Sequence, residues 1–211
     1  RDLSQFHLMT TFYGTPYIDI RIDFNSWLPK YLPKKLSEKI INFYLKTFKL
    51  KQYFHDKVEF EILLTCYSLN SQKKINERFK KILNKSEKKI LIKCLKKINI
   101  NALNQIKNDY NLIDELIKRQ NLIKQSPLYF IDKIYWLLED CKKFGTLPFA
   151  GLARCAFIST DILDSFVTEK IFTNNDRLKF LASVKTITSE LNEDLKKNKK
   201  FFLNKYGHLR P

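Results

Sequence analysis

The chain has 211 residues and very little glycine, and it lacks the glycine-rich loops that hold nucleotide phosphates. Only four glycines are present, and neither a Walker pattern nor a GxGxxG pattern occurs. No Ser/His/Asp or Cys/His nucleophile signature is recognisable either. These absences exclude a recognisable nucleotide-binding loop or hydrolase triad within the chain.

The four cysteines are too widely separated to form a structural zinc site. Cys66, Cys94, Cys141 and Cys155 form no CxxC pair and no Cys/His cluster. Each lies among apolar neighbours, which is typical of small core residues in a reducing compartment. We therefore expect no metal ligands among them, and we expect a cytoplasmic protein.

Long apolar runs are also missing. No run of about 18 apolar residues occurs, and no charged-then-apolar leader precedes a small-residue cleavage site. We therefore expect neither an integral membrane protein nor a secreted precursor, and no membrane as partner. Hydrophobic residues still make up 44% of the chain and aromatic residues 14%, which excludes a disordered chain.

The net charge is +17, and most of it comes from lysine, with 32 Lys and 7 Arg against 22 Asp and Glu. Proteins that grip nucleic acids use arginine for bidentate contacts, and no RNP, KH, zinc-finger or helix-turn-helix signature is present. We interpret most of the charge as a solvated surface and expect no nucleic acid as partner. A basic helical nucleic-acid-binding module is the alternative function. A helical scaffold that docks other proteins is a third hypothesis, which a large exposed apolar patch would favour.

Two stretches near the N-terminus alternate between apolar and polar residues as β-strands do. They cover residues 17–24 and 58–66, and the spacing of residues 33–51 between them is helical. We expect two antiparallel strands that pair across the helical insertion. This pairing would place Arg21 among the carboxylates of the second strand.

From residue 70 onward the spacing of apolar residues predicts helices. We expect them over residues 70–84, 86–98, 101–125, 126–145 and 149–172, and from after residue 175 to about 206. Ser86 and Ser126 are expected N-caps, and Gly145 is an expected helix stop. The predicted fold is mainly α: a helical bundle-like domain with a small two-stranded antiparallel β element near the N-terminus.

The glycines are concentrated in three short blocks, which cover residues 12–17, 144–154 and 205–211. The charged side chains in or beside these blocks are Arg21, Arg154, His208 and Arg210. Arginine in a chain that otherwise uses lysine suggests a need for the planar fork that binds carboxylate or phosphate. Glycines that only end helices are the alternative explanation.

These blocks, in this order, resemble a known enzyme family. The segments that carry the resemblance are residues 13–21, 24–26, 55–61, 65–67, 147–154 and 206–211. They are similar to the central domain of phosphoenolpyruvate-synthase-like phosphotransferases, the group that includes rifampicin phosphotransferase. The closer likeness is to the branch associated with capsular polysaccharide synthesis, where the enzyme is a glutamine kinase.

The resemblance implies a three-domain enzyme, in which residues 1–211 are a single acceptor-binding domain cut from a longer chain. An ATP-grasp domain would precede it, and a swivelling domain with a phosphorylatable histidine would follow. ATP, with Mg²⁺, would phosphorylate that histidine and yield AMP and phosphate overall. The phosphohistidine would then pass its phosphoryl group to the acceptor, which in the glutamine kinase is the side-chain amide of L-glutamine. The Thr-Ser-His motif of the swivelling domain is missing here, so His208 is not the phosphocarrier, and the segment alone should bind no cofactor and be inactive.

The same resemblance and the charges predict site residues. Arg154, His208 and Arg210 are candidates to meet the incoming phosphoryl group, and Glu59 is a candidate general base. The candidate substrate-binding residues are Tyr17, Asp19, Arg21, Asn25, Ser26, Lys57 and Glu61. In this prediction Arg21 holds the acceptor's α-carboxylate, and nearby carboxylates hold its α-ammonium group. For those carboxylates a structural cross-strand ion pair is the alternative.

Overall fold

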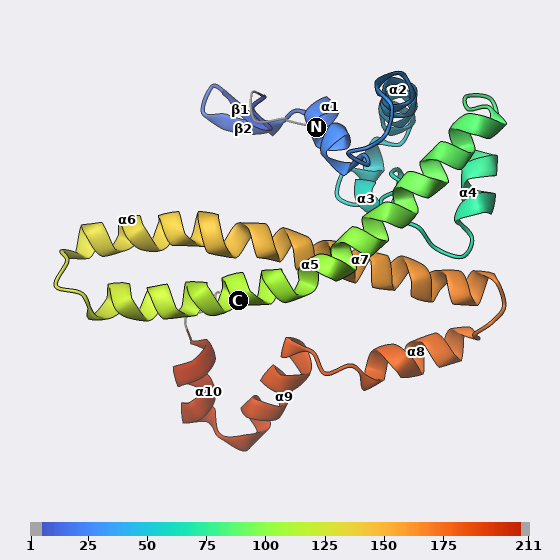
Figure 1. The fold of residues 1–211 in the computed structure, drawn as a ribbon. Coiled ribbons are helices and arrows are strands. Elements are labelled where there is room, and N and C mark those ends of the chain that lie inside the picture. The colour runs from blue at the N-terminus through green and yellow to red at the C-terminus, as the bar shows by residue number, and fades with distance from the viewer. Residues whose placement is uncertain (1–5, 208–211) are drawn as a thin grey trace. The chain divides into compact units, whose positions relative to one another are not determined.

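The computed structural model describes residues 6–207 and shows a mainly α-helical protein with a two-stranded antiparallel sheet near the N-terminus (Figure 1). The predicted fold class is therefore confirmed. The chain divides into two compact units, Arg1–Ser165 and Phe166–Pro211.

The sheet is a hairpin made by strands β1 (Met9–Phe12) and β2 (Thr15–Ile18). Phe12 pairs with Thr15, which leaves a two-residue turn of Tyr13 and Gly14. Both turn residues have positive φ, 50° and 78°, as the mirror-image turns favoured by hairpins require. Glycine adopts this conformation without steric cost, and it explains why a glycine lies in the first block.

The predicted pairing of residues 17–24 with residues 58–66 is wrong. Helix α1 (Ile20–Trp27) occupies most of the first stretch, and the short helix α3 (Val58–Glu61) begins the second. The Asp19 side chain accepts hydrogen bonds from the backbone N–H groups of Arg21 (2.9 Å) and Ile22 (3.1 Å) and so starts α1. This N-cap, together with an apolar face at helical spacing, outweighs the period of two.

The main core of the first unit forms where α1, α2 (Lys34–Leu50), α4 (Ser71–Arg78) and α5 (Lys85–Gln125) meet. Its most deeply buried side chains are Phe24, Ile40, Tyr44, Ile62, Ile75, Phe79, Leu91 and Leu95. The Tyr44 hydroxyl accepts a hydrogen bond from the backbone N–H of Leu64 (3.1 Å), which ties the segment after α3 to α2. A smaller core of Cys66, Ala102 and Ile158 joins that segment to α5 and α7 (Leu147–Thr168).

Helix α5 (Lys85–Gln125) is continuous over 41 residues, where two helices were expected. It starts with a capping box, in which Asn84 and Glu87 each accept the other's backbone N–H (both 2.9 Å), so Ser86 is not the N-cap. Asn99 does not break the helix because its side-chain amide is fully used elsewhere. It accepts from the Tyr67 backbone N–H (3.0 Å) and donates to the Tyr67 carbonyl (2.7 Å).

The next helices also differ from the expected boundaries. Ser126 ends α5 instead of capping the next helix, and α6 (Phe130–Asp140) starts after Tyr129. A six-residue π-helix, η2 (Cys141–Thr146), connects α6 directly to α7 (Leu147–Thr168). Gly145 therefore does not stop a helix.

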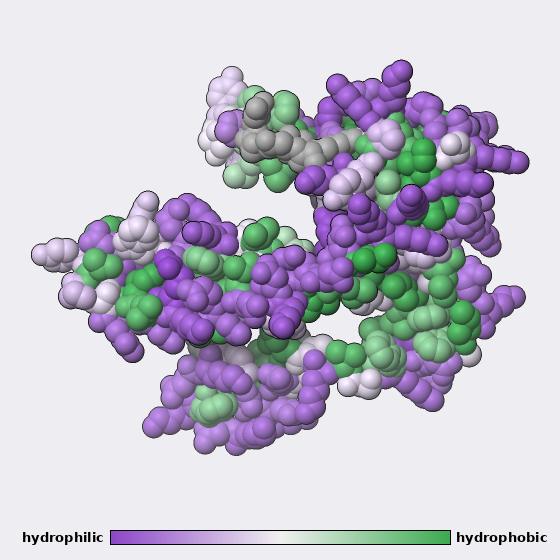
Figure 2. All heavy atoms as spheres, in the orientation of Figure 1, coloured by the Kyte–Doolittle hydropathy of each residue, from purple (hydrophilic) through white to green (hydrophobic). Residues whose placement is uncertain are grey.

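The continuous stretch Phe130–Thr168 spans 39 residues and is, by length and composition alone, apolar enough to cross a membrane. Core helices of soluble proteins meet the same two criteria, so this stretch does not decide whether the protein contacts a membrane. The expectation that it has no membrane as partner stays a prediction. Many of its large apolar side chains are exposed, and Figure 2 shows hydrophobic atoms among hydrophilic ones along α6 and α7. The most exposed of them are Phe130, Ile131, Leu147 and Phe149.

The second unit contains α8 (Asn174–Ser183), α9 (Ile187–Lys197) and α10 (Lys199–Tyr206), where one long helix was expected. Thr173, Thr186 and Asn198 each cap the helix that follows with a side-chain oxygen, so these polar residues divide the chain. Helices α9 and α10 are joined by Asp194, which accepts hydrogen bonds from Lys205 (2.8 Å) and the Tyr206 hydroxyl (2.9 Å).

Candidate functional site

Arg21 and the predicted carboxylates do not form the expected charged cluster. Asp19 is committed to the N-terminus of α1. The Arg21 guanidinium donates to Oδ1 of Asn42 on α2 (3.4 and 3.5 Å) and forms no ion pair with Glu59 or Glu61 in the described part of the chain. The predicted clamp for the acceptor's two charges is therefore wrong, because the two strands that would have paired are helices.

Two other predicted binding residues make bonds within α1. Asn25 donates to the Arg21 carbonyl (2.8 Å), and the Ser26 hydroxyl donates to the Asp23 carbonyl (2.6 Å). Asp23 itself is the half-buried acid of this helix. Desolvation raises the pKa of its carboxyl above the usual 3.8, a hydrogen bond from Trp27 opposes this, and the nearby Glu59 charge raises it further. Nothing in the sequence distinguishes Asp23 from its acidic neighbours.

Tyr17 lies at the edge of a mostly apolar cavity of about 640 Å³ beneath the hairpin. The same cavity is lined by Asp23 and His55, so it brings together Tyr17 of the 13–21 segment and His55 of the 55–61 segment. Lys57 is exposed next to α3. His208 and Arg210 lie outside the described residues.

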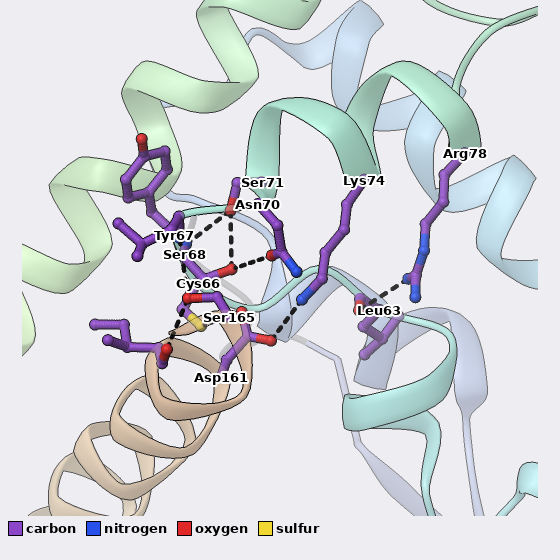
Figure 3. Close-up of polar contacts among 12 residues, drawn as sticks. Leu63, Cys66, Tyr67, Ser68, Asn70, Ser71, Lys74, Arg78, Asp161 and Ser165 are labelled. Atoms are coloured by element: carbon purple, nitrogen blue, oxygen red, sulfur yellow. Dashed lines mark hydrogen bonds and ion pairs between the residues drawn. The ribbon is translucent and has the colours of Figure 1, made fainter. Parts of the chain in front are cut away.

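The segment between α3 and α4 is fastened to α7 by polar contacts (Figure 3). The carboxylate of Asp161 on α7 forms an ion pair with Lys74, whose Nζ lies 2.7 Å from Oδ1. Its Oδ2 accepts a hydrogen bond from the Cys66 thiol (3.5 Å). Ser165 accepts a hydrogen bond from the Leu69 backbone N–H (3.2 Å). Burial, followed by the Asp161 charge, raises the pKa of Cys66 to about 12, which favours the protonated thiol over the thiolate.

Aromatic contacts bring three segments of the resemblance to one place. The Arg154 guanidinium on α7 lies 5.6 Å from the Trp27 ring at the end of α1. The Phe157 ring is 5.8 Å from Trp27 and 5.1 Å from Phe60 on α3. Arg154 therefore lies beside Trp27, which directly follows Ser26, and Phe157 on the same helix connects Trp27 to Phe60 of the 55–61 segment.

Gly151 lies one turn before Arg154 and allows a close approach of α7 to α5. A Cβ atom at this position would collide with the carboxylate of Asp109 on α5. Asp109 is only 2% exposed, and its Oδ2 has no hydrogen-bond partner among the described groups. The close contact fixes the first turns of α7 against α5 and thereby the position of Arg154.

A second cavity, of about 400 Å³, lies between the end of α1, the middle of α5 and the start of α7. Two predicted site residues, Ser26 and Arg154, line it. Its other polar lining residues are Lys30, Tyr31, Lys97, Asn101 and Gln105, and no Asp or Glu is among the described residues that line it. The structure thus joins two residues that are 128 positions apart in the sequence.

Arg154 is half-buried in this cavity, and no described carboxylate compensates its charge. Desolvation lowers the pKa of its guanidinium below its ordinary value, and the opposing influences come from Cys66 and Cys155. Lys97 also has no described ion-pair partner, and its Nζ lies 3.6 Å from the centre of the Tyr31 ring. A half-buried cation without a counter-charge is suited to hold an anion supplied from outside the chain.

No match to a known protein accompanies this geometry. No protein-family model, curated protein or solved structure matches the chain. The resemblance to phosphoenolpyruvate-synthase-like phosphotransferases therefore stays a prediction. Among the described residues no group of His, Cys, Asp and Glu could hold a metal ion, so nothing in residues 6–207 points to a resident cation.

The cavity also contains functional candidates that the sequence did not indicate. Lys30 and Lys97 are two of 32 lysines and have no distinguishing neighbours in the sequence. Asn101 and Gln105 lie in a long helix with many surface amides. Trp27 could have been found, because it is one of two tryptophans and directly follows Ser26.

Proposed function

We propose that the chain is the acceptor-binding domain of an ATP-dependent phosphotransferase, with the side-chain amide of L-glutamine as acceptor. The observation that supports the proposal is the proximity of three resemblance segments: Arg154 contacts Trp27, which directly follows Ser26, and Phe157 on the same helix contacts both Trp27 and Phe60. Segments that form one site in a family are expected to meet in space. These three do so although they are far apart in the sequence.

In the proposed reaction, the phosphoryl donor is a phosphohistidine on another domain of the same polypeptide. The glutamine amide nitrogen attacks phosphorus, the bond between phosphorus and the histidine nitrogen breaks, and a base accepts the amide proton. ATP and Mg²⁺ act earlier, on the domain that phosphorylates the histidine. This chain would contribute positive charge to the phosphoryl oxygens, for which the half-buried Arg154 is suited.

The test uses the full-length polypeptide with its ATP-grasp and phosphohistidine domains. Incubation with ATP, Mg²⁺ and L-glutamine should release AMP and give a phosphoramidate signal in phosphorus NMR. AMP formation with a different acceptor would replace glutamine and keep the phosphotransferase. No AMP with any amino acid or amide would overturn the proposal.

Two variants test the residues named for the reaction. Arg154→Lys keeps the charge but loses the planar fork, and we expect kcat to fall by about 10²-fold, the usual cost of one lost charge-stabilising donor. Glu59→Gln tests the predicted base, and kcat should fall because the group that accepts the amide proton is lost. A matched control is Glu139→Gln, which changes an exposed carboxylate on α6.

A further inference from the structure

In the cavity of about 400 Å³, three cations without a described ion-pair partner and several neutral polar groups face a common space. Its cations come from three separate elements: Lys30 from the segment after α1, Lys97 from α5 and Arg154 from α7. The amides of Asn101 and Gln105 and the hydroxyl of Ser26 line the same space. Neutral groups of this kind can donate to an anion and also bind its uncharged neighbours.

The charged side chains that line this cavity all have the same sign. Some cations of the first unit pair with carboxylates, as Lys39 does with Glu87 (2.6 Å) and Lys74 with Asp161 (2.7 Å), but neither of these lines the cavity. No described Asp or Glu lines the cavity. An external anion would therefore gain charge-assisted hydrogen bonds without first displacing a carboxylate of the protein.

Two of the cations lie against aromatic rings, which limits their freedom. Arg154 lies over Trp27 (5.6 Å), and Lys97 lies over Tyr31 (3.6 Å). Gly151 also lines the cavity, and its close contact with Asp109 fixes the turn of α7 that carries Arg154. A site whose cations are already positioned loses less conformational entropy when a ligand binds.

We propose that this cavity binds the anionic group of a small ligand, a carboxylate or a phosphoryl group, through Lys30, Lys97 and Arg154. Asn101 and Gln105 then contact the neighbouring polar atoms of the ligand. That the ligand is the amino-acid acceptor rests on the proposed function. In that case the acceptor's carboxylate is held in this cavity and not by Arg21, which is bonded to Asn42.

Binding is measured by NMR on the ¹⁵N-labelled 211-residue chain with three probes. The probes are inorganic phosphate, L-glutamine, and 4-aminobutanamide, which is L-glutamine without its carboxylate. We expect saturable shifts of the Lys97, Asn101 and Gly151 amide signals with phosphate, with L-glutamine, or with both. Shifts with phosphate but not with L-glutamine would assign a phosphoryl site. Shifts with L-glutamine but not with 4-aminobutanamide would assign a carboxylate site. Equal binding of L-glutamine and 4-aminobutanamide without phosphate binding, or no shift with any probe, would overturn the proposal.

Variants separate the cavity from the general basic surface. Lys97→Gln should weaken binding of the probe by about tenfold or more, because a hydrogen bond to a charged group is lost. Lys107→Gln is the matched control, since Lys107 is an exposed lysine on the same helix that does not line the cavity. Equal losses in the two variants would show diffuse attraction and refute the site. Arg154→Lys, with its fold checked by circular dichroism, tests the planar fork.

The two proposals fail in different ways. Suppose that phosphate binds to the chain and that Lys97→Gln weakens this binding, but that the full-length polypeptide makes no AMP with L-glutamine. The anion site is then supported and the proposed function fails. If the polypeptide makes AMP with L-glutamine and Lys97→Gln leaves the KM for L-glutamine unchanged, then the function stands and the acceptor is bound elsewhere.

Discussion

At the scale of single residues, Gly151 and Asp109 form the tightest contact that positions Arg154. The space for a Cβ at residue 151 is filled by the Asp109 carboxylate, which is buried and has an unpartnered Oδ2 among the described groups. Such a carboxylate is costly for the folded state, because its lost hydration is not replaced. The pair therefore couples the packing of two helices to the position of a candidate site residue.

Gly151→Ala should destabilise the protein by about 1–3 kcal/mol, because the added methyl group forces the two helices apart or the carboxylate out of place. Urea unfolding followed by circular dichroism measures the change. Asp109→Ala in the same chain should recover most of the loss, since it removes the group with which the methyl collides. Equal stability of Gly151→Ala and the unaltered chain would contradict the contact.

Asp23 should make stability depend on pH in the acidic range. The folded chain raises the pKa of this carboxyl above 3.8, mainly by desolvation, so it binds the proton more tightly than the unfolded chain does. The ionised group therefore costs stability above its folded pKa, and the cost disappears as the pH falls toward 3.8. Asp23→Asn should have the higher Tm at pH 7, and the difference should shrink as the pH is lowered to 4.

Thermal unfolding between pH 4 and pH 7 tests this expectation. Asp114→Asn is the matched control, because Asp114 is an exposed carboxylate on α5. A lower Tm of Asp23→Asn at pH 7 would mean that the Trp27 hydrogen bond outweighs desolvation.

At the scale of elements, α7 is held in place by the polar segment that follows α3. The ion pair of Lys74 with Asp161 is partly shielded, with side-chain exposures of 28% and 33%, and the Cys66 thiol shares the same carboxylate. The neighbouring contact of Ser165 with the Leu69 backbone adds a second bond to α7. These bonds hold the segment that carries residues 65–67 of the resemblance.

Asp161→Ala should reduce the free energy of unfolding by about 1–3 kcal/mol, because Lys74 is left partly buried without a partner. It should also speed hydrogen exchange of the amides in residues 66–69. Glu139→Gln is the control, since its partner Lys142 is 71% exposed and such surface pairs contribute little. Similar losses in both variants would mean that the Asp161 contact is not specific.

The same scale shows why the helices were predictable and the strands were not. Long amphipathic stretches predict helices well: α2 lies within an expected helix, and most of α5 and α7 lies in expected helical regions. Alternation over eight or nine residues is weaker, because Ile20 and Phe24 also share a helix face and Asp19 supplies an N-cap. Caps also explain the wrong boundaries: Asn84 starts α5, and Asn99 bonds to Tyr67 instead of ending it.

At the scale of the whole molecule, the net charge of +17 gave little help in finding a site. The rarer residues were more informative, since Arg154, Gly151 and Ser26 all line one cavity. The lysines that complete this cavity could not be chosen from the sequence, because which of 32 lysines lies beside Arg154 depends on the packing of α5 against α7. Arg21 was placed wrongly for the same reason, since its partner depended on a strand pairing that does not form.

The division of the chain into two units predicts that the first unit folds without the second. Both buried cores and both cavities lie within residues 8–163, and the unit boundary follows Ser165 inside α7. A shortened chain of residues 1–168 retains α7 to its end at Thr168. It should therefore unfold cooperatively, and the NMR signals of the buried residues Phe24, Leu95 and Ile158 should stay near their positions in the full chain. It should also keep the response to phosphate, if the full chain has it. Collapse of the signal dispersion would show that residues 169–211 are needed for the fold, whereas a preserved fold with altered phosphate binding would show that they contribute to the site.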